Sequence, residues 1–328
     1  MRGSAGRNDA GGAAARRAAG RRPVAILLLA VMAAVLATAA AAWSGRATAA
    51  PGGGKIVAVG AESQYADVIG QVGGKYVQAS AIMSNPSTDP HTFEASIAVA
   101  REVGSARLVV QNGVGYDAFM NTIESAAPSS GRTVIDVQRL LKLSDATPNP
   151  HLWYDPGTMP RVADSIAAAL SAIQPSHKAY FEANAAAFKD SLGKLTAAIA
   201  SFKAAYSGAP VATTEPVADY LLTSLGADNL TPWTFQADVM NGVDPSPQNV
   251  AVQRALLSEH KVKVLLYNQQ VTDTLTESFI TLAEQNHIPV VGVYETMPEP
   301  GYDYQTWMQT EVQDLRAAVA DNIATEHL

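Results

Sequence analysis

The feature that most constrains the fold is an alternation of strands and helices that occurs twice and is interrupted by one long helix-forming tract. Residues 160–206 form this tract, which is rich in alanine and is broken only at Gln174-Pro175. Because Pro175 suits a first helical turn, we expect one helix to end there and a second of about 30 residues to begin. So long a helix is not an ordinary connection. It predicts two lobes.

Short β-type runs alternate with helix-length segments on both sides of the tract. Their order predicts an α/β fold in which each lobe has a parallel four-stranded sheet flanked by helices. The runs are KIVAVG, YVQASAIM, RLVVQNG and TVIDV, then PVATT, NLTPWTF, VKVLLYNQ and IPVVGVY. The predicted domains are an N-terminal lobe at 51–174, one long rigid linking helix at 175–207 and a C-terminal lobe at 208–328. A ligand is expected in the cleft between the lobes.

The first 50 residues have the layout of an export signal. Two Arg-Arg pairs precede an apolar run at 24–42, and the stretch closes with Ala47-Thr48-Ala49, the small-x-small pattern of a cleavage site. We therefore expect a signal peptide at 1–50 and a periplasmic or other extracytoplasmic location. Retention of the run as an uncleaved anchor is the alternative.

Composition excludes several classes of site and partner. The chain has no cysteine, so thiolate metal ligands and a lipid anchor on cysteine are not expected. Its formal net charge is −7, and the domain after the leader has no basic tract, so nucleic acid is a poor candidate partner. A metal site must use histidine, carboxylates and neutral oxygens, and we expect a monomer.

Four potential metal ligands follow β-type runs. His91 and His151 lie in the triplets DPH and NPH, Glu215 ends VATTE, and Glu295 ends VVGVYE. Because ligands in parallel sheets sit beyond the carboxyl ends of the strands, two residues from each lobe could converge on the cleft. Two imidazoles and two carboxylates would complete the ligand set of a divalent transition metal.

Each of these residues also has an ordinary interpretation. A histidine is more often solvated or satisfied in a core, although the proline before His91 and His151 restricts the positions that each ring can sample. Glu215 could be an acidic residue favoured in a first helical turn, and Glu295 a plain strand-end residue. The other histidines are predicted to be solvated; they are His177, His260, His287 and His327. Asp89, Asn112 and Asp155 could orient the imidazoles.

From about residue 55 to 326, the chain resembles the solute-binding proteins of zinc and manganese ABC transporters, the cluster A-I metal receptors. The similarity rests on DPHTFEASIAVAREVGSARLVVQNGVGYD, NPHLWYDP, EPVADYLLTSLG and IPVVGVYETMPEPGYDYQTWM. The resemblance implies two α/β lobes joined by one long rigid helix, with the metal between them. It places the metal ligands on His91, His151, Glu215 and Glu295, and implies delivery of the ion to a membrane permease.

The sequence departs from this family's pattern in several places. The segment 138–149 has no histidine, where zinc receptors often carry a histidine-rich loop. Glu215 replaces the histidine, and Glu295 the aspartate, that many members have. These oxygen ligands favour Mn²⁺ or Fe²⁺ in coordination number, whereas Zn²⁺ has the higher intrinsic affinity. The cysteine that carries a lipid anchor in many members is also missing.

Three other functions are alternatives to metal capture. A secreted metal-dependent hydrolase needs an open metal position and a general base, and the sequence has neither HExxH nor G-x-S-x-G. We therefore expect no enzyme activity. An adhesin-like surface role would coexist with metal binding, and a receptor for an organic solute would leave the two Pro-His pairs without a role.

Overall fold

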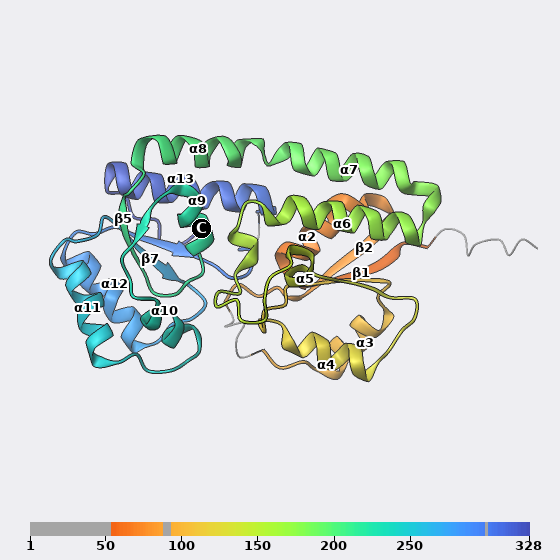
Figure 1. Ribbon diagram of the computed structural model, residues 1–328, viewed down its shortest axis with the longest axis horizontal. Helices are drawn as coiled ribbons and strands as arrows, with labels where there is room; N and C mark the ends of the chain where they lie inside the picture. Colours follow the sequence, from red (N-terminus) through yellow and green to blue (C-terminus); the bar gives the residue numbers. More distant parts are fainter. Residues whose placement is uncertain (1–53, 88–92, 299–300) are drawn as a thin grey trace, which may run out of the picture. The chain divides into compact units, whose positions relative to one another are not determined.

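The computed structural model describes residues 54–87, 93–298 and 301–328, of which 55–328 form one compact unit (Figure 1). The predicted signal peptide and His91 lie outside the described residues. None of the helices that the structure does describe is both long enough and apolar enough to cross a membrane.

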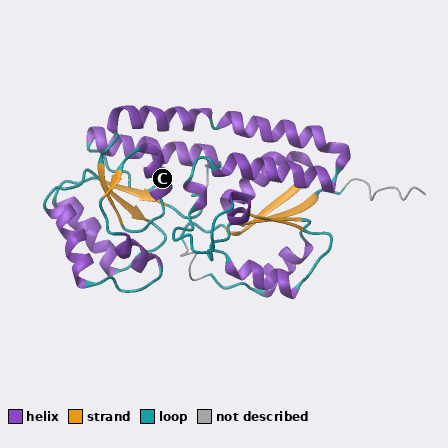
Figure 2. Cartoon of the chain, viewed as in Figure 1, coloured by secondary structure: helices purple, strands orange, loops and turns teal. Residues whose placement is uncertain are grey.

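The strands lie in two separate groups with helices around them (Figure 2). The first lobe is built on a four-stranded sheet with the order β2-β1-β3-β4. Every neighbouring pair is parallel, as the alternation predicts. Its strands are β1 (Ile56–Glu62), β2 (Val77–Met83), β3 (Leu108–Gln111) and β4 (Thr133–Asp136). Its helices are α2 (Ser63–Gly73), α3 (Ile97–Ser105), α4 (Ala118–Ala126), α5 (Val137–Leu141) and α6 (Thr158–Ile173). Short 3₁₀ turns lie at Gly74–Tyr76 and Leu152–Tyr154.

The second lobe repeats this topology with the sheet order β6-β5-β7-β8, again with parallel pairs. Its strands are β5 (Pro210–Thr213), β6 (Asp228–Asn229), β7 (Leu265–Asn268) and β8 (Val290–Val293). Its helices are α9 (Asp219–Leu225), α10 (Trp233–Met240), α11 (Pro247–Ser258), α12 (Thr274–Gln285) and α13 (Tyr304–Asp321).

One prediction for this lobe was wrong. NLTPWTF was expected to be a strand, but only Asp228–Asn229 pairs, and α10 begins at Trp233. Pro232 explains the difference, because it lacks the N–H that a strand would donate. Its carbonyl instead accepts hydrogen bonds from the backbone of Phe235 and Gln236, which starts the helix.

The linking tract crosses from one lobe to the other along one side of the unit (Figure 1). It consists of a 3₁₀ turn at Pro175–His177 followed by α7 (Lys178–Ser191) and α8 (Gly193–Tyr206). The predicted helix is therefore interrupted at Leu192, where ψ is −5° and the backbone N–H bonds three residues back to Lys189. One turn of 3₁₀ type thus separates two successive helices.

A second connection between the lobes is made by α13. It packs against α8 of the linking tract, yet its first residue reaches the first lobe: the Tyr304 N–H donates to Asp67 at 2.9 Å, and the Tyr304 hydroxyl donates to the Trp153 carbonyl at 2.7 Å. Tyr154 makes the reverse contact, donating to the Tyr294 carbonyl at 2.8 Å. The lobes are therefore joined by α7–α8 and by α13.

The interface around α13 contains a buried acid. Glu311 is 3% exposed; its Oε1 atom accepts a hydrogen bond from the Trp307 indole at 3.0 Å and lies 3.1 Å from the Tyr154 hydroxyl oxygen. Burial raises the pKa of Glu311 from 4.5 to about 8, since a carboxylate loses its hydration there. The folded protein consequently holds a proton on Glu311 at neutral pH, which the unfolded chain releases.

This linkage predicts a pH-dependent stability. The contribution of Glu311 is fully present below about pH 4.5 and is lost as pH rises through about 8, because the unfolded state binds fewer protons in that window. Between pH 5 and 9, wild type should lose about 2–4 kcal/mol more unfolding free energy than Glu311→Gln, whose amide oxygen can still accept the Trp307 bond. Urea unfolding at several pH values measures this. Glu284→Gln, at an exposed glutamate, is the control, and equal pH profiles for Glu311→Gln and wild type would contradict the assignment.

Candidate metal centre

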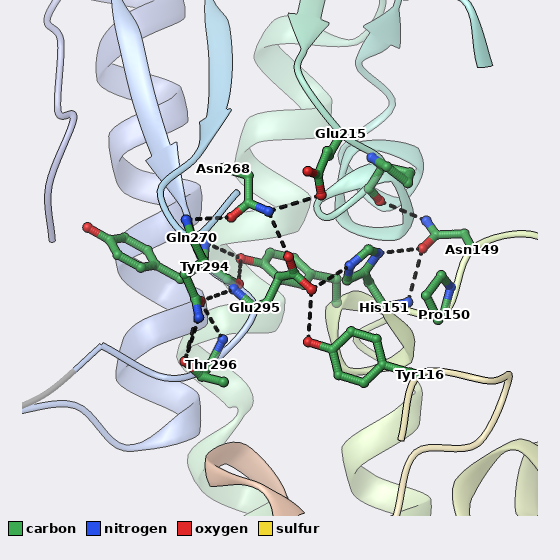
Figure 3. A network of polar contacts seen from close by, with 12 residues as sticks. Tyr116, Asn149, Pro150, His151, Glu215, Asn268, Gln270, Tyr294, Glu295 and Thr296 are labelled. Carbon is green, nitrogen blue, oxygen red and sulfur yellow. Dashed lines mark hydrogen bonds and ion pairs between the residues drawn. The ribbon is translucent and has the colours of Figure 1, made fainter. Parts of the chain in front are cut away.

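His151 lies between the lobes, at the start of the 3₁₀ turn Leu152–Tyr154, and is fully buried. Asn149 fixes its orientation: the Asn149 Oδ1 atom accepts from the His151 backbone N–H at 3.0 Å and lies 2.8 Å from the ring Nδ1 (Figure 3). The Asn149 amide nitrogen meanwhile donates to the Pro216 carbonyl at 2.8 Å. Because Oδ1 is an acceptor, Nδ1 donates its hydrogen to it, and Nε2 is the ring nitrogen that faces the cleft.

Glu295 meets His151 from the other lobe, directly after β8. The Glu295 Oε2 atom lies 3.2 Å from His151 Nε2 and accepts from the Tyr116 hydroxyl at 2.8 Å. Its Oε1 accepts from the Asn268 amide at 2.7 Å. The Glu295 backbone is held by Gln270, whose Oε1 accepts from its N–H at 2.7 Å. The carboxylate is fully buried, so its position is set by protein contacts rather than by water.

Glu215 follows β5 and is 2% exposed. It is joined to Glu295 through Asn268, the last residue of β7, whose Nδ2 atom donates to Glu215 Oε2 at 3.0 Å. One amide group thus lies between the two carboxylates (Figure 3). Unpaired buried carboxylates are costly, and the Asn268 amide balances part of their charge.

The four predicted ligands differ in how closely the structure places them to one another. His151 and Glu295 are in direct contact, Glu215 is connected to Glu295 by Asn268, and His91 is outside the described residues. Within the described ranges, no three histidine, aspartate or glutamate side chains are grouped so that they could hold an ion as they stand. The four-ligand site therefore stays a prediction.

Sequence reasoning missed several residues that shape the site. Asn149 is in the same NPH triplet as His151, and Asn268 follows a β-type run as the predicted ligands do, so the strand-end rule could have found both. Asn112 was expected to orient an imidazole. It contacts the residue before His151, because its amide donates to the Pro150 carbonyl at 2.8 Å. Asp155 is exposed and instead accepts from the Gly157 N–H.

The surroundings of Tyr116 are rich in acidic groups. Burial raises the pKa of Glu62 well above its ordinary value and that of Asp117 to about 6. The pKa of Tyr116 is raised by its burial and by the charges of Glu295 and Glu62, so Tyr116 remains a hydrogen-bond donor. A cation in this region would relieve the repulsion among the acids.

Residues 59–318 match the model of a family described as zinc-uptake complex component A, periplasmic. A manganese-binding lipoprotein of Bacillus subtilis, MntA, is 29% identical over 40% of this chain, but the match spans only 44% of that protein. A manganese ABC transporter substrate-binding lipoprotein of Streptococcus mitis, PsaA, is 24% identical over 75% of this chain and 82% of its own length.

A solved structure shares the fold. The periplasmic zinc-binding protein TroA of Treponema pallidum superposes with a TM-score of 0.69, at 18% identity, and covers 83% of this chain and 100% of its own. At that identity the likeness supports the two-lobed architecture, not the identity of a ligand.

The Asn268 bridge predicts a measurable cost. Asn268→Ala removes the donor shared by the two carboxylates, so the metal-free protein should lose about 2 kcal/mol of unfolding free energy, because each carboxylate loses a charge-assisted bond. Urea unfolding in the presence of a chelator measures this loss. Asn241→Ala is the matched control: its exposed amide donates only to a helical carbonyl, and a change within about 0.5 kcal/mol is expected. An equal effect of the two substitutions would rule out the bridging role.

Proposed function

Because the chain belongs to the zinc-uptake component A family, we propose that it captures a divalent transition metal ion outside the cytoplasm and delivers the ion to the permease of an ABC transporter. The named relatives bind manganese or zinc, and the ion proposed here is Mn²⁺, Zn²⁺ or Fe²⁺. It is cargo that is bound and released, not a resident cofactor.

The contact between His151 and Glu295 carries the proposal. Two donors bound at about 2.1 Å to one tetrahedral or octahedral ion lie roughly 3.0–3.4 Å from each other. The 3.2 Å between His151 Nε2 and Glu295 Oε2 falls within that interval, and Asn149 holds the ring through its other nitrogen, Nδ1. The pair therefore forms one edge of a coordination polyhedron, supplied by both lobes.

Glu215 and His91 are the proposed remaining ligands. Asn268 now donates to both Glu215 and Glu295, so Glu215 joins the ion when metal contacts replace these bonds. When the ion binds, its positive charge replaces the Asn268 amide in part as the group that balances the buried carboxylates of Glu215 and Glu295. The role of His91 rests on the DPH triplet and on the family pattern, in which it matches the first ligand.

The carboxylates favour an ion with a higher coordination number, which suits Mn²⁺. Zn²⁺ binds more tightly to nearly any site of this kind, so selection must come from geometry. Glu295 contributes to this selection, since Tyr116 and Asn268 hold both of its oxygens.

Release to the permease is expected to use small displacements. Two connections, α7–α8 and α13, hold the lobes, which disfavours a wide hinge motion. We propose a monomeric carrier rather than an enzyme, because the family is one of metal uptake and the sequence has neither HExxH nor G-x-S-x-G. The layout of residues 1–50 supports export by an N-terminal signal. Both named manganese-binding relatives are lipoproteins, whereas this sequence has no cysteine to carry a lipid anchor.

Metal content measured on variants tests the proposal. The purified protein, dialysed against equal concentrations of Mn²⁺, Fe²⁺ and Zn²⁺, should retain one ion per chain by elemental analysis. His151→Ala should abolish retention, and Asn149→Ala should weaken it about 10- to 100-fold, because the ring loses its orienting partner. Binding should also weaken on acidification, since protons compete for the ligands.

A second histidine provides the control. His177 stacks on Tyr76 in the first lobe at a ring-centroid distance of 3.8 Å, so His177→Ala should leave metal retention unchanged. Retention by His151→Ala of a tightly bound ion that survives exhaustive dialysis against metal-free buffer would overturn the proposal. Turnover of ester, peptide or phosphate substrates by the metal-loaded protein would also overturn it. Cells that lack the protein should also accumulate less of the bound metal.

A further inference from the structure

Three helices of the second lobe end around one small pocket, at the opposite end of β7 and β8 from the candidate metal centre. The residues that follow α11, α12 and α13 are His260, His287 and Asn322, and all three line a cavity of about 240 Å³. Each is exposed. The two imidazoles come from segments that are far apart in the sequence but precede neighbouring parallel strands.

The backbone at these positions is in the left-handed region, with φ of 53° at His260, 56° at His287 and 58° at Asn322. The ends of α11 and α12 are Schellman motifs: Lys261 N–H bonds to the Leu256 carbonyl at 3.0 Å, and Ile288 N–H to the Ala283 carbonyl at 2.9 Å. The residue that such a motif places in the left-handed region is usually glycine.

Elsewhere in the same lobe the chain does use glycine. α9 ends on Gly226, with φ of 70°. A residue with a Cβ atom costs roughly 1 kcal/mol in this conformation, although histidine and asparagine are enriched there. Helix termination alone therefore does not require an imidazole at His260 or His287, and strained positions of this kind tend to cluster at functional sites.

The chemistry of the pocket favours a cation that binds nitrogen. Three helix C-termini converge on it, and each carries partial negative charge on its last carbonyls. Two imidazoles and an amide oxygen are donors for a divalent transition metal, with water in the remaining positions. Lys263 also lines the pocket, but it is exposed and its flexible side chain can extend into solvent. The positive charge of Lys263 repels a metal cation, so we expect the site to bind the ion weakly.

We propose that His260 and His287, assisted by Asn322, form a second and weaker binding site for a divalent transition metal ion. This site is separate from the cleft between the lobes and does not depend on the proposed transport function. His260 and His287 were predicted from the sequence to be solvated, and they are exposed. The inference is that they share one ion.

Zn²⁺ binding to the purified protein tests the second site. Equilibrium dialysis with elemental analysis should give two ions per chain at excess Zn²⁺, one tight and one weak. The double variant His260→Gly/His287→Gly should weaken the second ion at least tenfold and leave the first unchanged. Its melting temperature should not fall, because glycine suits both backbone positions. In a His151→Ala background, the weak ion should remain after the tight ion is lost, which separates this inference from the proposed transport site.

Two further variants make the result specific. Lys142→Gly is the matched control, because Lys142 also follows a helix in the left-handed region, with φ of 60°, but lies in the other lobe. His260→Asn/His287→Asn keeps polar side chains that tolerate this backbone and removes only the imidazoles. Both imidazoles should shift in histidine-selective NMR spectra as Zn²⁺ is added. Persistence of the weak ion in both double variants, or Zn²⁺ titrations that leave the His260 and His287 signals unshifted, would overturn the proposal.

Discussion

The buried carboxylate of Glu295 is the point on which the arrangement of the lobes and the chemistry of the cleft both depend. It accepts hydrogen bonds from Tyr116 of the first lobe and from Asn268 of the second, and its Oε2 atom lies 3.2 Å from His151 Nε2. A fully buried charge must be balanced by nearby donors, so the lobes have to meet closely at this residue. The contacts of Tyr154 and Tyr304 keep that spacing.

Much of this could be predicted from residue order alone. Parallel strands place the residues that follow them along one edge, and Glu215 and Glu295 lie where this rule puts them. The repeated topology follows from the same alternation, because a strand and its helix are both local patterns. NLTPWTF shows the limit of such patterns. Its apolar residues are typical of a strand, but Pro232 ends the strand pairing and a helix begins at the next residue.

What the sequence could not supply is information about partners from distant segments. Asn268 is important because two carboxylates from other strands meet at its amide, and Asn149 because its amide reaches the Pro216 carbonyl of the other lobe. The interruption at Leu192 and the left-handed conformations of His260 and His287 are equally hidden, since each depends on how a helix ends.

The two lobes have the same strand order, yet they are not independent modules. The largest apolar core runs without a break from β1 and Trp153 of the first lobe, along α8 of the linking tract, to Trp307 of the second lobe. A chain divided between the halves would leave one side of that core in water on each fragment. The duplication is therefore one of topology only, and thermal melting should be a single cooperative event, in which the halves gain and lose their structure together.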